Sequence, residues 1–309
     1  GVSEDEYDGP ELKTVGWSNL TLLEVQRRLR ASPPDEDLVP AQEALLRRAR
    51  VVVSLPEGLR HGVPAGPWSV TQKPDSMLPP SGDKHDYYTT GGYVWPCTTT
   101  CVEAGFKQEQ CSSWDAGLRT FGPCNKDTGL PWVARDGFMN RKGNQDLDAL
   151  IVMADVVEVL TLAWWFAPAS NETLTFARTA AKVVRAWFLD EATRQTPKLL
   201  YAGAVPGKYN GTAGGVIAMS FRLNARLGDC IELLRTAGED VWSGADTAGW
   251  KGWAAAWYEW LRTSKFGEIE MAAKGNHATF LFLHKIALAS ATDNSSALLE
   301  EVATLREGL

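Results

Sequence analysis

The stretch Leu147–Phe166, which reads LDALIVMADVVEVLTLAWWF, decides the fold class of this chain. It is apolar on almost every side and long enough to cross a bilayer. Asp148, Asp155 and Glu158 interrupt it, and three carboxylates would be costly at membrane depth. The stretch therefore predicts a helix buried in the core of a globular protein, and we expect no membrane partner.

Helical patterns continue on both sides of this stretch. After it, the spacing of Ala177, Ala180, Ala181 and Val184 marks one face of an amphipathic helix, with Asn171 as its expected N-cap. Strand patterns are scarce, so the sequence predicts an all-α array of helical hairpins. The other predicted helices cover residues 20–30, 41–53, 215–237, 247–263, 276–291 and 295–306.

The charge and tryptophan content of the chain limit the classes of function it can have. With 31 Lys and Arg against 38 Asp and Glu among 309 residues, the formal net charge is −7, which disfavours a nucleic-acid partner. Thirteen tryptophans suit either a core or a platform for sugar rings. Four of them recur at spacings of three and four residues, which predicts a core stripe: Trp250, Trp253, Trp257 and Trp260.

Residues 56–146 form a long region with almost no helical periodicity, and we interpret it as a functional loop region within a single domain of residues 1–309. It carries Cys97, Cys101, Cys111 and Cys124, whose spacing lacks a Cys-x-x-Cys pair. Two disulfides are therefore expected rather than zinc, and Cys97 with Cys101 and Cys111 with Cys124 is the favoured pairing among three. We expect neither a metal nor a cofactor.

Four Asn-x-Ser/Thr sequons accompany the cysteines and favour secretion by a eukaryotic route. The chain begins without a signal peptide, so we expect it to start at a mature or trimmed terminus. The expected glycosylation sites are Asn19, Asn171, Asn210 and Asn294.

Four blocks of sequence stand out along the chain. The first two are PPSGDKHDYY at 79–88, followed by GYVWP at 92–96, and GLPWVARDG at 129–137, followed by Asn140. The last two are YAGAVPG at 201–207, and WYEWLRTSK at 257–265, leading to NHATF at 276–280. These blocks resemble, in the same order, the motifs of the alginate lyase superfamily.

The resemblance implies an α/α toroid, or incomplete α/α barrel, with a long inserted loop that bears disulfides. It also implies a secreted enzyme that cleaves an anionic uronic-acid polymer, mannuronan or glucuronan, by β-elimination. That reaction needs a group that neutralises the uronate carboxylate, a base for the C5 proton and an acid for the departing O4 oxygen.

Asn276 and His277 match the motif that carries this chemistry in the family. Gly275 breaks the chain before them, so both should open a helix whose N-terminus favours an anion. The asparagine amide can bind the carboxylate, and the histidine can serve as base or, when protonated, as a second donor. The plainer alternative is a helix cap and a buried structural histidine. His284, seven residues further on, is interpreted as structural or as part of a distant subsite.

The resemblance also implies that His85, Tyr87 and Tyr88 line the substrate site, with loop packing as their alternative role. Tyr93 and Trp95 are candidates for a sugar platform, with anchoring of the disulfide-bearing loop as the alternative. Arg135 and Lys84 would supply positive charge for uronate carboxylates, and Tyr201 is a further candidate for the site.

This chain departs from the family pattern at several positions. Gly203 stands where many relatives carry a glutamine, and Phe280 and Leu281 replace a tryptophan and a tyrosine. Relatives continue into a segment with an arginine and a catalytic tyrosine, so this chain is expected to be either a fragment or a natural short form. In a short form Tyr87, or failing that Tyr201, would supply the proton, and the helical face left open would favour self-association.

Two other functions compete with the lyase. One is a non-catalytic carbohydrate-binding or structural relative that has lost part of the site. The other is a glycoside hydrolase that uses Asp83 or Asp86 together with Asp136.

Overall fold

The computed structural model describes residues 12–54, 59–60, 63–64, 69–73, 75, 78–97, 120–121, 131–135, 137–138, 140, 145–204, 213–214, 216, 219, 223, 225–273 and 275–308. Its helices follow the predicted periodicity, with two exceptions: α9 was not foreseen, and the helix predicted over 215–237 is wrong at its start, because α7 begins at Ala225 after a bend at Leu223. They are α1 (Asn19–Arg30), α2 (Val39–Ser54), α4 (Gln145–Phe166), α5 (Asn171–Val184), α7 (Ala225–Leu234), α8 (Gly244–Thr263), α9 (Lys265–Met271), α10 (Asn276–Ala291) and α11 (Ser295–Gly308).

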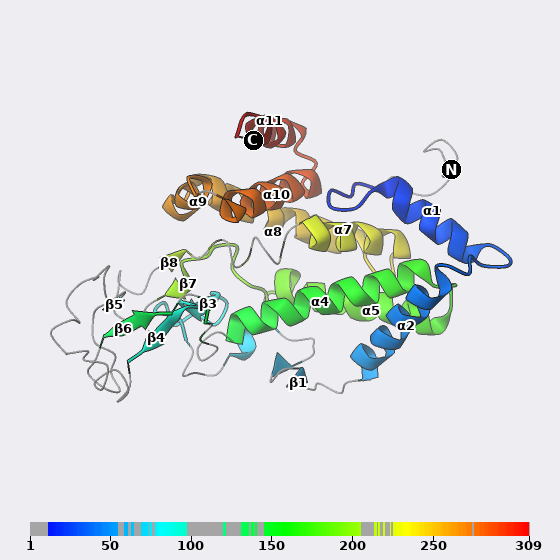
Figure 1. The fold of residues 1–309 in the computed structure, drawn as a ribbon, viewed down its shortest axis with the longest axis horizontal. Helices are drawn as coiled ribbons and strands as arrows, with labels where there is room; N and C mark the ends of the chain where they lie inside the picture. The colour runs from blue at the N-terminus through cyan, green and yellow to red at the C-terminus, as the bar shows by residue number, and fades with distance from the viewer. Residues whose placement is uncertain are drawn as a thin grey trace.

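The apolar stretch forms α4, which lies at the centre of the helical layers. Its length and composition would suit a membrane span, yet 61% of its most apolar window is buried inside the protein. It packs against α2, α5 and α7, and Figure 1 shows it between these neighbours. The prediction of a buried core helix is confirmed.

Helix caps explain why the elements begin where they do. Ser170, not Asn171, is the N-cap of α5, because the Ser170 hydroxyl accepts a hydrogen bond from the backbone N–H of Thr173. The predicted cap was therefore wrong by one residue. Helix α8 begins in the same way, with a capping box between Ser243 and Asp246.

The helices stack in layers, as Figure 1 shows. Helices α2, α4 and α5 form one layer, α7 and α8 the next, and α9 with α10 another, while α11 covers α10. Successive helices such as α4 and α5, or α10 and α11, pack on each other across short connections. This arrangement confirms the predicted all-α class built from helical hairpins.

The tryptophan stripe of α8 lies inside the protein. Trp250, Trp253 and Trp257 are buried, and their rings stack in sequence at centroid distances of 5.9 and 5.8 Å. Trp260 continues the stack, with its ring centroid 5.3 Å from that of Trp257. Phe188 meets the stripe from a single π-helical turn at Arg185–Leu189. The core interpretation of this stripe is confirmed.

The short strands of two three-stranded sheets lie at the left-hand end of Figure 1, whereas β1 lies below α4. Together the strands form the pair β1–β2, the parallel sheet β3–β7–β8 and the antiparallel sheet β4–β6–β5. Their bounds are β1 (Leu59–Arg60), β2 (Val63–Pro64), β3 (Tyr88–Thr90), β4 (Val94–Pro96), β5 (Thr120–Phe121), β6 (Trp132–Ala134), β7 (Tyr201–Ala204) and β8 (Ala213–Gly214).

The predicted disulfides and glycosylation sites fall only partly within the described residues. Cys97 is buried beside β4, whereas Cys101, Cys111, Cys124 and Asn210 lie outside the described residues. Asn171 and Asn294 are exposed. The side-chain amide of Asn19 donates to the carbonyl of Leu12 at 2.7 Å.

Candidate active site

The corner between α9 and α10 presents Asn276 and His277 as predicted. Gly275 is the N-cap of α10 and has a φ of +76°, a conformation that glycine adopts without strain. Asn276 is exposed, and the His277 side chain keeps 45% of its surface open to solvent. Because both residues lie in the first turn of a 16-residue helix, they face the end of the dipole that favours an anion. The alternative of a buried structural histidine at this position does not fit its exposure.

Glu270 contacts His277 from the preceding helix. Its Oε1 atom lies 2.7 Å from Nδ1 of the imidazole, and only 9% of its side chain is exposed. Sequence reasoning missed Glu270, because seven residues and a break between two helices separate the pair. No local periodicity indicates that a carboxylate in α9 meets a side chain in α10.

The parallel sheet β3–β7–β8 lies next to this corner, because α9 packs against β8. Tyr88 in β3 and Tyr201 in β7 are register partners, so their side chains share one face of the sheet. Both are half-buried, while the alternate residues Thr89 and Ala202 are buried, so this face is the more accessible one. Burial also raises the pKa of Tyr88.

Gly203 shares the accessible face of β7 with Tyr201. It has a φ of +74°, and its backbone N–H donates to the Thr89 hydroxyl at 2.8 Å. A side chain at this position would be strained. The structure thus provides a conformational reason for glycine where many relatives carry glutamine.

Tyr87 points away from this face. It is fully buried and belongs to the main hydrophobic core. A buried phenol cannot reach a polymer in solvent, so this structure contradicts its predicted role as proton donor. The side chain next to it, Tyr88, takes the accessible position because successive residues of a strand face opposite sides.

A buried ion pair anchors the segment that carries Tyr87 and Tyr88. Lys73 Nζ lies 2.5 Å from Asp146 Oδ2, and their side chains are 1% and 2% exposed. Asp146 also accepts the backbone N–H of Tyr88 at 2.7 Å, and Lys73 donates to the carbonyl of Asp86. Burial raises the pKa of Asp146, and Lys73 opposes that shift. The pair fixes the start of β3 on the N-terminus of α4.

The aspartates proposed for a hydrolase serve the turn before β3. Asp86 is buried and accepts hydrogen bonds from the hydroxyls of Ser81 and Thr196. Asp83 accepts the backbone N–H of His85 at 2.9 Å, and Asp136 lies outside the described residues. The Asp86 carboxylate is therefore engaged in structure and is not open to a substrate.

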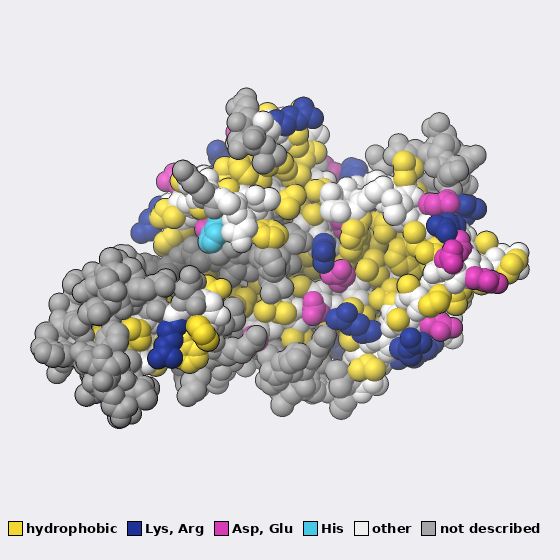
Figure 2. All heavy atoms as spheres, in the orientation of Figure 1, with side chains coloured by type: hydrophobic (Ala, Val, Ile, Leu, Met, Phe, Trp, Pro, Cys, Tyr) yellow, Lys and Arg dark blue, Asp and Glu magenta, His cyan; other side chains and the backbone are white. Residues whose placement is uncertain are grey.

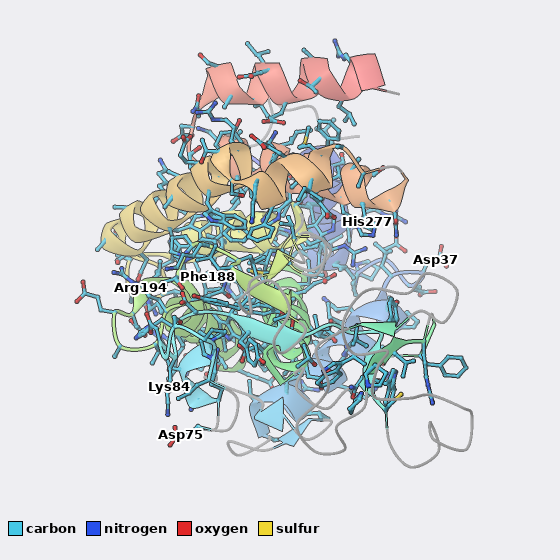
Figure 3. The ribbon with its side chains drawn as sticks, turned by 90° about the vertical axis from the view of Figure 1, so that its left-hand side faces the viewer. Asp37, Asp75, Lys84, Phe188, Arg194 and His277 are labelled. Atoms are coloured by element: carbon cyan, nitrogen blue, oxygen red, sulfur yellow. The ribbon has the colours of Figure 1, made fainter. Side chains whose placement is uncertain are left out.

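Lys84 and His85 lie on a different side of the molecule from His277. Figure 3 shows Lys84 at one side together with Phe188 and Arg194, and His277 at the other. Lys84 pairs with Asp75 at 2.9 Å, and His85 Nδ1 contacts the carbonyl of Arg194 at 2.6 Å. His85 lines a groove of about 580 Å³ with Arg194 and Trp253. The structure does not bring these two predicted residues to the α9–α10 corner.

Tyr93, Trp95 and Arg135 form a separate cluster on the sheet β4–β6–β5. The Arg135 guanidinium lies 5.9 Å from the ring centroid of Trp95, and the backbone N–H of Arg135 donates to the carbonyl of Tyr93 at 2.8 Å. The indole N–H of Trp95 donates to the carbonyl of Phe138 at 2.9 Å. Tyr93 and Phe138 are 48% and 69% exposed. Figure 2 shows positive and hydrophobic side chains together over β4 and β6. The predicted aromatic and cationic residues are thus neighbours here. Their aromatic rings could stack on a sugar ring, and the guanidinium could bind its carboxylate.

His284 is structural, which is one of the two roles expected for it. It is 1% exposed, and the indole N–H of Trp257 donates to its Nε2 at 3.3 Å. Burial lowers its pKa to about 3, so the imidazole is neutral near pH 7. Within the described residues, no group of three His, Cys, Asp or Glu side chains is placed to hold a metal ion.

Comparisons with known proteins identify the family of this chain. Residues 69–309 match the alginate lyase family. The crystal structure of an alginate lyase from Bacteroides ovatus superposes with a TM-score of 0.72 at 25% sequence identity, covering 96% of this chain and 66% of that one. This chain therefore spans slightly less than two thirds of that protein, and no curated protein matches it. The chain belongs to the alginate lyase family.

Proposed function

We propose that this protein is a secreted polysaccharide lyase that cleaves a uronic-acid polymer, mannuronan or glucuronan, by β-elimination. The observation that carries the proposal is the exposed Asn276–His277 pair at the N-terminus of α10, in a chain of the alginate lyase family. An amide, an imidazole and the positive end of a helix dipole suit a substrate whose carboxylate gains charge during the reaction.

The proposed elimination assigns a task to each group. A base removes the C5 proton, the released electron pair forms a C4–C5 double bond, and the bond from C4 to the bridging O4 breaks. Asn276 donates its amide N–H to the carboxylate and so stabilises the charge that develops next to C5. His277 acts through Nε2, either as the base at C5 or, when protonated, as a second donor to the carboxylate.

The departing O4 oxygen needs a proton, and Tyr201 is the proposed donor. It lies on the accessible face of β7, next to the strand against which α9 packs. Tyr88 is one strand further from that helix. Tyr87 is removed from this role by its burial.

The cluster of Tyr93, Trp95 and Arg135 supports an acidic carbohydrate as the substrate class. Exposed aromatic faces stack on sugar rings, and a guanidinium binds a carboxylate in a bidentate manner. Local positive charge is needed on a chain whose net charge is −7. The exposed sequons at Asn171 and Asn294 support the proposed secretion.

The test is the ultraviolet absorbance of the unsaturated uronate product, measured with polymannuronate and glucuronan. We expect absorbance to rise with the wild-type protein and to stay flat with His277→Ala. Thr279→Ala, at an exposed position of the same helix, is the matched control and should stay active.

A flat trace from folded wild-type protein on both polymers would overturn the lyase proposal. Binding of uronan oligosaccharides without turnover would then favour a non-catalytic relative. Gly203, which lacks the amide found in many relatives, is the feature that supports this second candidate.

A further inference from the structure

The contact between Glu270 and His277 has a chemical consequence. A carboxylate accepts hydrogen bonds and an imidazole nitrogen can donate one, so Oε1 of Glu270 at 2.7 Å from Nδ1 places the proton of the neutral ring on Nδ1. Nε2 is then left without a proton. Because Nδ1 faces the buried carboxylate, Nε2 lies at the opposite edge of a ring whose side chain is 45% exposed.

Glu270 is well placed to hold this orientation. It is the last residue but one of α9, and a short connection leads from α9 to the first turn of α10. Its carboxylate is 9% exposed, whereas the imidazole is 45% exposed. A buried acceptor beneath a partly exposed ring restricts the ring more than an acceptor that moves freely in solvent.

We propose that Glu270 is a positioning residue for His277, which fixes the imidazole with Nδ1–H toward the protein and Nε2 toward the substrate. The inference rests on the proposed function, because it gives Nε2 a substrate to meet. Both roles open to His277 require this orientation, since a base and a donor to the carboxylate each act through Nε2. Glu270 itself does not touch the substrate.

The experiment compares Glu270→Gln with Glu268→Gln in the full chain. Both changes remove one negative charge from α9, but Glu268 is exposed. We expect kcat on the active uronan to fall by about 10- to 100-fold in Glu270→Gln with KM within about twofold of wild type. Glu268→Gln should match wild type, and Glu270→Asp should recover part of the loss.

A spectroscopic readout separates positioning from general structural damage. Nitrogen-15 spectra of the His277 imidazole in alkaline buffer report which nitrogen carries the proton. We expect the Nδ1–H tautomer alone in wild type and in Glu268→Gln. Glu270→Gln should give a mixture of tautomers, because the glutamine amide can either accept from Nδ1–H or donate to an unprotonated Nδ1. If Glu270→Gln gives no cooperative thermal transition, Glu270→Asp takes its place, with a smaller fall in kcat and a mixture of tautomers expected.

Three results would overturn the inference: unchanged kcat in Glu270→Gln, a fall in kcat while the Nδ1–H tautomer persists alone, or an Nε2–H tautomer in wild type. Absence of product from wild type on every uronan would refute the proposed function instead. In that case the spectra still decide whether Glu270 orients the ring, so the two failures are distinguishable.

Discussion

The buried histidine of α10 should make this protein sensitive to mild acid, and His284→Gln should remove that sensitivity. Burial lowers the pKa of His284 to about 3 from its ordinary value of 6.5. Between these two values the unfolded chain binds a proton on this ring and the folded chain does not. The free energy of unfolding contributed by this group therefore falls as the pH falls below 6.5.

The magnitude follows from the separation of the two pKa values. Well below pH 6.5 each pH unit costs about 1.4 kcal/mol until the folded pKa is approached, and the total loss from pH 7.5 to 5.0 is about 2 kcal/mol. About a sixth of this loss occurs between pH 7.5 and 6.5. Glutamine keeps an acceptor for the indole N–H of Trp257 and does not titrate.

The assay is urea unfolding of both proteins at pH 7.5 and 5.0, followed by tryptophan fluorescence. We expect wild type to lose about 2 kcal/mol more than His284→Gln between the two pH values. Burial also raises the pKa of Asp229 to about 6. This shift changes the free energy of unfolding in the opposite direction, because ionisation of Asp229 destabilises the folded state as the pH rises. That contribution is common to both proteins and cancels in the comparison. Equal losses in the two proteins would refute the reasoning.

Three further predictions concern the anchor, the α8–α9 corner and the proton donor. Asp146→Asn leaves Lys73 buried without its counter-charge and should cost about 3–5 kcal/mol in urea unfolding. Gly267→Ala should cost about 1–3 kcal/mol or more in a thermal or urea melt, because its Cβ would lie 1.7 Å from a backbone carbonyl oxygen at the end of α8. Tyr201→Phe should lower the rate of product formation by about 100-fold or more, whereas Tyr87→Phe should leave it within a few-fold of wild type.

Each of these predictions has a matched control. The double variant Lys73→Met with Asp146→Leu leaves no unpaired charge and should recover part of the stability lost by Asp146→Asn. The recovery is incomplete because the Tyr88 N–H and the Asp86 carbonyl lose their side-chain partners. Gly228→Ala, inside α7 where a Cβ would meet nothing within 4 Å, should stabilise the protein by about 0.5–1 kcal/mol. A stable Gly267→Ala, or equal activity of the two tyrosine variants, would contradict the corresponding argument.

Local patterns predict much of this protein because helices depend on neighbours three and four residues away. The apolar run of Leu147–Phe166, the tryptophan stripe of α8 and the glycine before Asn276 each act within a few turns of chain. These signals place most of the predicted helices within a few residues of their observed bounds, and α7, which begins ten residues after the predicted start, is the exception. They also place Asn276 and His277 at the start of α10.

Contacts between distant segments decide the rest. Two adjacent tyrosines in a three-residue strand carry no local sign of which one is buried, and the core behind β3 decides that it is Tyr87. Lys73 and Asp146 are 73 residues apart in the sequence, and Glu270 meets His277 only because α9 turns into α10. Sequence alone determined the helices and the residue types at the candidate site. Tertiary structure decided which side chains are accessible and which partners orient them, because burial and hydrogen-bond geometry depend on what packs from elsewhere in the chain.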